Sequence, residues 1–283
     1  MIKRILIPLD SSVYTDAAIS YGCFLARRSD AQLTGLAVLD VPGIEKSVGT
    51  LPVGGIYFAD KLVAAKKDEA LAHITSLVNN FKVTCEREGV SYRIAELQGN
   101  PSSQIIQESL FYDRVVTGLR TYFHCPGKAP VEGDPIDSML AQTITPFVAV
   151  PAVLPPFPTR DKKWKILMAF NGSLPSVRAM HRFAQTSKPE EYEVKVLMAH
   201  DDEVAANYLL GRAVRYLEAH GFENVQAEFV AASKTSDTAE QFYGWADKIV
   251  LGVHSKAAFV DFMVGSLSKK LIRHGKKMLL LGQ

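Results

Sequence analysis

Short runs of consecutive apolar residues alternate along the chain with longer segments whose apolar residues recur at helical spacing. Residues 5–7 and 33–39 are runs of the first kind, which is typical of strands buried on both faces of a parallel sheet. Residues 61–87 have apolar positions at helical spacing with charges between them, and Asn100 followed by Pro101 is a common start of a helix. This alternation predicts βαβ units and therefore an α/β fold built on parallel sheet.

The same pattern occurs twice. The segment RILIPLDSS at residues 4–12 is matched by KILMAFNGS at residues 165–173, and a helical run follows each, ending near Arg28 in the first copy and near Thr186 in the second. Three further pairs of strands match: residues 33–39 and 194–200, residues 113–118 and 247–252, and residues 147–150 and 278–281. An internal repeat of this length predicts two domains of one fold, for which 283 residues leave enough room.

The boundary between the copies is predicted at a stretch that contains three prolines. We place the first domain at residues 1–153, an extended and semi-rigid linker at residues 154–163, and the second domain at residues 164–283. The first copy also has a glycine- and proline-containing insertion at residues 42–57 that the second copy lacks. We expect this insertion to be a surface loop after the second strand.

Composition limits the partners and the compartment. The chain is 47% apolar and 22% charged, as expected of a globular protein, and its 32 basic residues nearly balance its 30 acidic ones. The resulting charge of +2 provides no field that would draw the protein to nucleic acid or to a membrane. The N-terminus starts a strand pattern without a signal peptide or membrane span, so we expect a cytoplasmic protein. Its three cysteines have no C-x-x-C spacing, which favours reduced, mostly buried thiols over a zinc site or a redox dithiol.

The candidate ligand site lies at the ends of the first and fourth strands of the second copy. In open parallel sheets, ligands bind beyond the carboxyl ends of the strands, where the strand order reverses. Those strands end at Asn171 and Gly252, and a small residue allows a ribose or phosphate to approach the backbone. Further along, Gly265 and Ser266 open the helical run at residues 267–274, where free amides and the helix dipole favour anions, although Ser at this place is also a common N-cap.

With these residues, both copies resemble the universal stress protein (Usp) family over nearly the whole chain. The second copy resembles the ATP-binding branch, whose fingerprint is G-x2-G-x9-G-[S/T]. Gly252, Gly265 and Ser266 stand at that spacing, and Ser255 replaces the second glycine, which leaves a hydroxyl that could serve a ribose. The resemblance implies two tandem, open, twisted five-stranded parallel sheets of a Rossmann-like, adenine-nucleotide α-hydrolase-like fold.

The resemblance also implies how the nucleotide is held. Family members cradle adenine with backbone near the ends of strands one and two, which here means Ala169, Phe170 and Ala199. The family has an aspartate at the end of the first strand, close to the ribose and the metal, and Asn171 takes its place here. An amide oxygen can still bind Mg²⁺ but carries no charge, so weaker metal affinity is expected.

The first copy matches the fingerprint less well. Asp10 and Gly118 are present, but Thr121 stands where the fingerprint has its second glycine. The loop between this position and the last strand is also longer than in the second copy. When Pro146 is aligned with the proline that commonly precedes the last strand in the family, Gly133 and Asp134 take the place of the Gly-Ser pair. A carboxylate facing phosphates in a partly desolvated pocket costs on the order of several kcal/mol, so this copy is expected to be degenerate or to bind a different ligand.

The family also suggests how the copies assemble. Members commonly pair their last strands antiparallel across a two-fold axis, and a tandem chain can make that contact between residues 147–150 and 278–281. We therefore expect an intramolecular pseudo-dimer, with any homodimer formed through another surface.

Two functions remain open. The first is an ATP-binding regulator of the stress response with unknown protein partners, and the second is a ligand-free tandem scaffold that acts through protein contacts. The sequence has neither G-x-x-x-x-G-K-[ST] nor G-x-G-x-x-G and shows no combined nucleophile, base and orienting group, so we expect no enzyme beyond slow ATP hydrolysis. A basic run near the C-terminus favours a solvated face over a phosphate contact: Lys269, Lys270, Arg273, Lys276 and Lys277.

Overall fold

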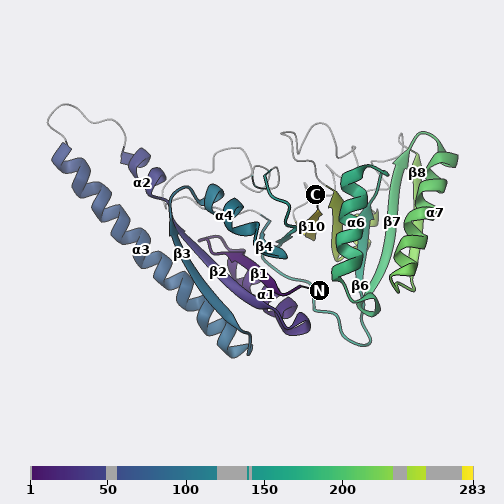
Figure 1. Cartoon of the computed structure of the whole chain (residues 1–283), viewed down its shortest axis with the longest axis horizontal. Helices are drawn as coiled ribbons and strands as arrows, with labels where there is room; N and C mark the ends of the chain where they lie inside the picture. The colour runs from purple at the N-terminus through teal and green to yellow at the C-terminus, as the bar shows by residue number, and fades with distance from the viewer. Residues whose placement is uncertain are drawn as a thin grey trace. The chain divides into compact units, whose positions relative to one another are not determined.

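The computed structural model describes residues 2–48, 56–119, 139, 142–231, 241–252 and 276–282 (Figure 1). The chain divides into two compact units, an N-terminal unit of residues 2–143 and a C-terminal unit of residues 144–283. Each unit is an α/β structure in which strands alternate with helices, so the fold class predicted from the periodicity is confirmed.

The N-terminal unit has four described strands, in the order β3-β2-β1-β4 and all parallel. β1 connects to β2 in one direction along the sheet, and β4 lies on the other side of β1, so the order reverses at β1. The elements are β1 (Arg4–Pro8), α1 (Thr15–Ser29), β2 (Gln32–Leu39), α2 (Val41–Val48), α3 (Ile56–Arg87), β3 (Tyr92–Gln98), α4 (Pro101–Ser109) and β4 (Arg114–Gly118).

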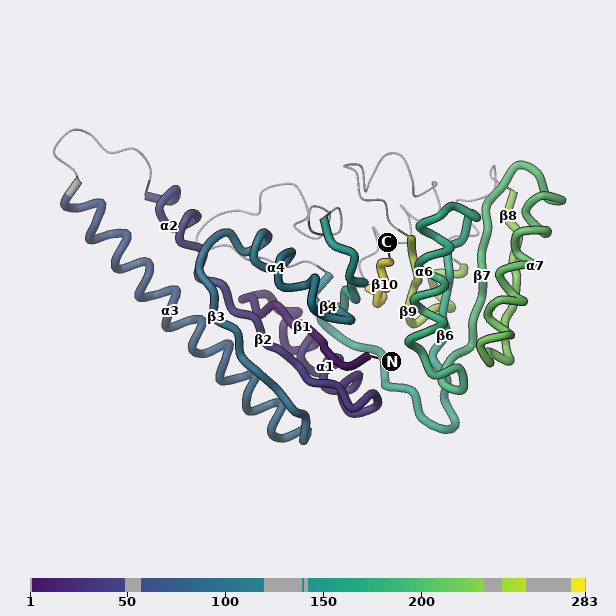
Figure 2. The backbone as a smooth tube through the Cα atoms, viewed as in Figure 1, coloured from purple at the N-terminus to yellow at the C-terminus, as the bar shows by residue number. Residues whose placement is uncertain are grey.

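The C-terminal unit repeats this order as β8-β7-β6-β9 and adds β10 and β5 beyond β9. β10 pairs parallel with β9 and antiparallel with β5. The elements are β5 (Phe147–Val150), β6 (Trp164–Ala169), α6 (Leu174–Thr186), the 3-10 turn η1 (Pro189–Glu191), β7 (Tyr192–His200), α7 (Glu203–Ala219), β8 (Val225–Ala231), β9 (Lys248–Gly252) and β10 (Met278–Gly282). The chain can be followed through both units in Figure 2.

The central strands are fully buried because helices cover them. Ile5, Leu6 and Ile7 of β1 each have 0% of their surface exposed, which explains why the strand is a continuous apolar run. α6 contacts β9 and β10, and α7 contacts β7 and β8. Asn100 caps α4 as predicted, because its side chain accepts a hydrogen bond from the backbone N–H of Ser103 at 3.0 Å.

One difference concerns the last strand of the first copy. The sequence repeat assigns β5 to the first of two five-stranded sheets, whereas the compact units divide before Ile144 and place β5 in the C-terminal unit. There β5 pairs with β10, with Val148 opposite Leu280. Contact with β10 therefore decides where this strand belongs, and the N-terminal unit retains β1 to β4.

The insertion expected to be a surface loop is partly helical. Its first half forms α2, which Asp40 caps by accepting a hydrogen bond from the N–H of Gly43 at 2.9 Å, and its last residues start α3. At 1.5 Å per residue the 32 residues of α3 span about 48 Å, against about 27 Å for the eight residues of β2. α3 therefore continues past the sheet (Figure 1), and Tyr57 and Phe58 near its start are 63% and 72% exposed. None of the helices in the described part of the chain is long and apolar enough to cross a membrane.

The proline-rich stretch before β6 is held against the C-terminal unit. The indole N–H of Trp164 donates to the carbonyl oxygen of Pro156 at 2.8 Å, and the Phe157 and Trp164 rings lie 6.1 Å apart. Thr159 and Lys162 exchange two backbone hydrogen bonds and close a turn between them. The extended conformation predicted for this stretch is therefore combined with specific contacts to the start of β6.

Candidate functional site

The carboxyl ends of β6 and β9 lie side by side where the strand order of the C-terminal unit reverses. β6 is flanked by β7 on one side and β9 on the other, and Ala169 stands opposite Leu251 in the β6–β9 pair. The next residues along the two strands, Phe170 and Gly252, therefore leave the sheet together, with Asn171 directly after Phe170. In parallel α/β sheets this switch point is where ligands bind.

Asn171 forms a tight polar turn that starts α6. Its side-chain Oδ1 accepts hydrogen bonds from the backbone N–H of Ser173 at 3.1 Å and from the Ser173 hydroxyl at 2.6 Å. The hydroxyl of Ser176 donates to the Ser173 carbonyl oxygen at 2.9 Å. Gly172 has a φ of 73°, a left-handed conformation that favours glycine in this turn. The two lone pairs of Oδ1 are thus both used in hydrogen bonds. The magnesium role expected for Asn171 remains a prediction, and Mg²⁺ would have to compete with Ser173 for this oxygen.

The N-terminal unit has a turn with matching side-chain hydrogen bonds at the end of β1. Asp10 Oδ1 accepts hydrogen bonds from the backbone N–H of Ser12 at 3.3 Å and from its hydroxyl at 2.8 Å. The hydroxyl of Thr15 also contacts Oδ1 and lies 2.8 Å from the Asp10 carbonyl oxygen. Asp10 is only 4% exposed. An aspartate and an asparagine therefore accept matching hydrogen bonds, but Ser11 does not share the left-handed backbone of Gly172, so the two turns differ in both charge and backbone conformation.

The glycines that end β4 and β9 have a packing role in both units. A Cβ atom added to Gly252 would lie 2.3 Å from the carbonyl carbon of Pro175 and 2.3 Å from the amide nitrogen of Ser176, in the first turn of α6. A Cβ atom added to Gly118 would lie 2.4 Å from Cβ of Tyr14, just before α1. The space beside each glycine is thus filled by the start of a helix. The sequence predicted that a ligand would approach the backbone closely at Gly252. On the side where a Cβ atom would lie, the backbone at the start of α6 occupies that place instead.

The residues expected near adenine lie at the same edge. Phe170 is 6% exposed and its N–H donates to the carbonyl oxygen of Leu197 at 2.9 Å, which extends the β6–β7 pairing by one residue. Ala169 and Ala199 are half-buried at the ends of their strands. The structure thus brings together five of the predicted site residues: Ala169, Phe170, Asn171, Ala199 and Gly252. The remaining three, Ser255, Gly265 and Ser266, lie outside the described residues, as do Thr121, Gly133 and Asp134 of the first copy.

Two polar features of this edge were not identified from the sequence. His200 ends β7, and its Nδ1 lies 2.9 Å from both the backbone nitrogen and the carbonyl oxygen of Asp202, so the start of α7 holds the ring in either tautomer. Asp202 in turn caps α7 through the N–H groups of Val204 and Ala205, at 2.8 and 3.1 Å. The second feature is the pair of hydroxyl groups of Ser173 and Ser176 in the turn before α6. The sequence repeat could have indicated it, because Ser12 and Thr15 stand at the matching positions of the first copy.

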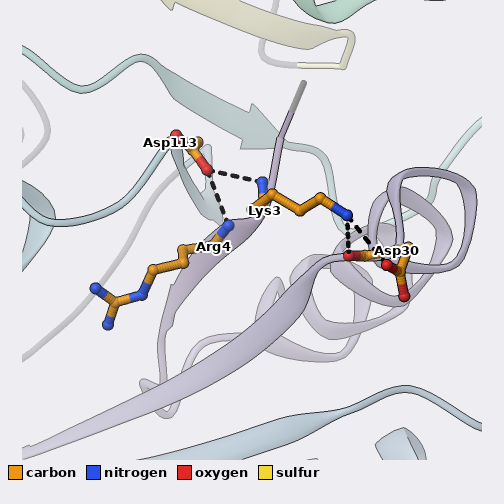
Figure 3. Close-up of polar contacts among 4 residues, drawn as sticks. All are labelled: Lys3, Arg4, Asp30 and Asp113. Atoms are coloured by element: carbon orange, nitrogen blue, oxygen red, sulfur yellow. Dashed lines mark hydrogen bonds and ion pairs between the residues drawn. The ribbon is translucent and has the colours of Figure 1, made fainter.

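The opposite edge of each unit is held by a second repeated aspartate. Figure 3 shows the Asp113 carboxylate between the backbone nitrogens of Lys3 and Arg4, which donate to it at 2.7 and 2.9 Å, and the Lys3 ammonium paired with Asp30. Asp247 accepts from the N–H of Lys165 at 3.0 Å in the same way. These aspartates tie the fourth strand of each unit to the start of the first and have a structural role. Among the described residues no group of three or more His, Cys, Asp or Glu side chains is placed to hold a metal ion.

Comparison with known proteins identifies a family match for part of the chain and similar folds for the whole of it. Residues 1–116 match the model of the universal stress protein family, and no curated protein matches the chain. The fold is similar to that of a universal stress protein from Archaeoglobus fulgidus DSM 4304, with a TM-score of 0.67 and 16% identity over 99% of this chain and 98% of that chain.

Two further solved structures extend the comparison. A candidate universal stress protein from Pseudomonas aeruginosa UCBPP-PA14 has a TM-score of 0.54 and 14% identity over 99% of this chain and 93% of that chain. The cytoplasmic domain of a prokaryotic cation chloride cotransporter has a TM-score of 0.51 and 10% identity over 99% of this chain and 95% of that chain. At these identities the likeness concerns the fold alone. Residues 1–116 therefore match the universal stress protein family, and the chain as a whole has a fold similar to that of solved universal stress proteins.

Proposed function

We propose that the chain is a tandem universal stress protein whose C-terminal half binds ATP and whose activity as a stress-response regulator depends on that ligand. One observation carries this proposal: Asn171 and Gly252 lie next to each other at the switch point of the C-terminal sheet. That is where parallel α/β sheets bind nucleotides, and the Gly-x2-Ser-x9-Gly-Ser spacing begins at that same glycine.

The proposed contacts follow from where these residues stand. Backbone groups of Ala169, Phe170 and Ala199 would line the adenine, and Asn171 and Ser255 would face the ribose. The amides and hydroxyl of the Gly265-Ser266 pair would bind the phosphates at a helix start, where the dipole favours negative charge. Mg²⁺, if bound with the nucleotide, would be held mainly by the phosphates, with Asn171 as a neutral ligand.

We propose binding rather than turnover as the function. No described residues at the edge combine a nucleophile, a base and an orienting group, because the hydroxyls of Ser173 and Ser176 are engaged in the turn. Any hydrolysis of ATP would be slow and incidental to a change of partner. The nucleotide is therefore proposed to act as a ligand that alters which proteins this chain contacts.

A ligand-free scaffold is the second candidate, and specific contacts favour it. The oxygen of Asn171 is fully hydrogen-bonded within the protein, and the space beside Gly252 is filled by α6. Both residues thus have an explanation without a ligand. Mass spectrometry of small molecules released from the purified, unheated protein separates the two candidates, since only the first predicts a bound adenine nucleotide.

We further propose that the two copies form a pseudo-dimer within one chain. The antiparallel pairing of β5 with β10 supports this arrangement, because it joins the last strand of one sequence copy to the last strand of the other. A homodimer would then have to use a different surface. The cytoplasm and protein partners remain part of the proposal.

Calorimetric titration of the chain with ATP is expected to give a stoichiometry near one, because only the second copy has the fingerprint spacing. Gly265→Asp should abolish the heat, since it places a carboxylate against the phosphates. Ser266→Ala should weaken binding about tenfold to a hundredfold, because a hydrogen bond to a charged group contributes about 1.5–3 kcal/mol.

The matched control for this titration is Gly133→Asp, which introduces the same charge at the corresponding place in the first copy and should leave ATP binding unchanged. Thermal melts of all variants establish that they remain folded. Two equivalent sites, or a folded Gly265→Asp variant that binds ATP like the parent, would show that the phosphates bind elsewhere.

A further inference from the structure

Two buried cysteines meet between the helices of the N-terminal unit. Cys23 lies on α1 and Cys85 on α3, and they are 1% and 0% exposed. Their thiols are hydrogen-bonded to each other. The two residues are far apart in the sequence, so no C-x-x-C motif marks them. The fold alone creates this dithiol.

The packing of α1 and α3 on one face of the sheet brings the cysteines together. A Cβ atom on Gly22 would lie 2.4 Å from Ile7 of β1, and one on Gly35 of β2 would lie 2.9 Å from Phe81 of α3. Ile7 and Gly35 are paired neighbours in the sheet, so their side chains share a face, which both helices cover. Glycine on one side of each contact allows the helices to lie close to the strands.

Contacts on either side of the cysteines hold the two helices in register. Toward the helix starts, the Asn80 amide donates to the Asp16 carboxylate at 2.7 Å. Toward the helix ends, Arg27 and Glu88 form an ion pair. Arg27 follows Cys23 by four residues and Glu88 follows Cys85 by three, which is the spacing of neighbours on a helix face. The ion pair thus lies one turn beyond the dithiol, on its solvent side.

The two thiols differ in how readily they ionise. The hydrogen bond from Cys85 lowers the pKa of Cys23, and the nearby Arg27 and Arg87 guanidinium groups add to this effect against burial and the Glu88 carboxylate. The same hydrogen bond and burial raise the pKa of Cys85. These opposite directions of the pKa shifts, with Arg27 and Arg87 near Cys23, favour the thiolate on Cys23 over the thiolate on Cys85. This division suits a nucleophilic and a resolving cysteine.

Burial sets how an oxidant would reach the pair. In the closed structure both sulfur atoms are shielded, but Cys85 is two residues from the end of α3 at Arg87, where helices open most easily. The covering Arg27 and Glu88 side chains are 45% and 30% exposed, and ion pairs of this kind are weak. A brief opening of this last turn would expose the thiols without unfolding the sheet.

We propose that Cys23 and Cys85 form a redox-active pair that a hydroperoxide converts into a disulfide joining α1 to α3. The Cys23 thiolate attacks one peroxide oxygen and the O–O bond breaks, which gives a sulfenic acid and a hydroxide (or an alkoxide) that takes up a proton. The Cys85 sulfur then attacks the Cys23 sulfur, the S–O bond breaks, and the departing hydroxide takes the Cys85 proton to form water. Two thiols lose two electrons in total, and the peroxide is reduced.

Peptide mapping of the full chain tests this proposal without any mutation. The protein is treated with hydrogen peroxide under native conditions, denatured with N-ethylmaleimide to block free thiols, and digested with trypsin. Residues 5–27, which contain Cys23, and residues 83–87, which contain Cys85, are separate tryptic peptides. We expect them to appear as one linked species that dithiothreitol separates, and the protein to remain monomeric in mass on a non-reducing gel.

Three variants serve as controls. Cys23→Ser and Cys85→Ser should each abolish the linked species, whereas Cys125→Ser, which leaves the pair intact, should form it like the parent. Because the thiols are buried, we also expect the rate of linkage to reach a plateau as the peroxide concentration rises, when opening of the helix end becomes limiting.

The parent protein decides the question even where a serine variant fails to fold. If the native parent yields both peptides only as separate maleimide adducts or as higher oxides, or if Cys125 or a second chain takes the place of either cysteine in the linkage, the proposal is wrong.

Discussion

Replacing Gly252 with alanine is expected to destabilise the C-terminal unit by about 3 kcal/mol, the upper end of the usual cost of overpacking a core. The added methyl group would lie 2.3 Å from backbone atoms of Pro175 and Ser176, which cannot rotate away as a side chain could. In a domain of about 150 residues or more, 1 kcal/mol corresponds to about 2–4 °C, so the melting temperature should fall by roughly 6–12 °C. Differential scanning calorimetry of nucleotide-free protein measures this change.

Gly211 provides the matched control, because it lies inside α7 and an added Cβ atom would meet only the end of the Arg215 side chain at 3.6 Å. Gly211→Ala should raise the stability by about 0.5–1 kcal/mol, the usual helix preference for alanine. A Gly252→Ala protein that melts like the parent but no longer binds ATP would contradict the packing role. It would assign the space beside this glycine to the ligand instead.

Removing residues 278–283 is expected to unfold the C-terminal unit and cause association. β10 lies between β5 and β9, and four of its side chains are almost completely buried. Burying an apolar side chain contributes about 1.5–3 kcal/mol, so these four contribute about 6–12 kcal/mol, which is comparable to the whole stability of a typical domain at about 5–15 kcal/mol. They are Met278, Leu279, Leu280 and Leu281.

Circular dichroism melts and size-exclusion chromatography with light scattering measure the effect of this truncation. Any part of the sheet that survives would expose unpaired strands at β5 and β9, which promotes aggregation. A chain ending at Gly282 retains β10 and should behave like the parent. A monodisperse truncated chain with the parent's melting temperature would show that the two copies do not depend on their last strands, and the pseudo-dimer would be wrong.

The position of the candidate site could be predicted because it depends on the strand order, which follows from the repeat. Strands one and four of a copy end at the switch point in any fold of this class, so Asn171 and Gly252 had to lie close together. The detailed contacts could not be predicted in this way. That Asn171 Oδ1 is occupied by Ser173, and that α6 fills the space beside Gly252, depends on the path of one short turn.

The insertion at residues 42–57 shows that the spacing of apolar residues was insufficient to predict where helices begin. Its glycine and proline residues indicate a loop, but Asp40 supplies a cap that starts α2, and α3 extends back to Ile56. Helix ends depend on such single hydrogen bonds and on neighbouring elements, which composition does not report. The middle of α3 was predicted correctly because its apolar spacing is long and regular.

The elements, their order and the repeat follow from the sequence because each is a local pattern that a buried strand or an amphipathic helix requires of its own residues. Two features depend on residues distant in the chain and emerge only when the chain has folded. They are the closing of α6 onto Gly252 and the meeting of Cys23 with Cys85 between α1 and α3. Burial of apolar surface brings these partners together without requiring any particular spacing between them, so no local pattern records the contact.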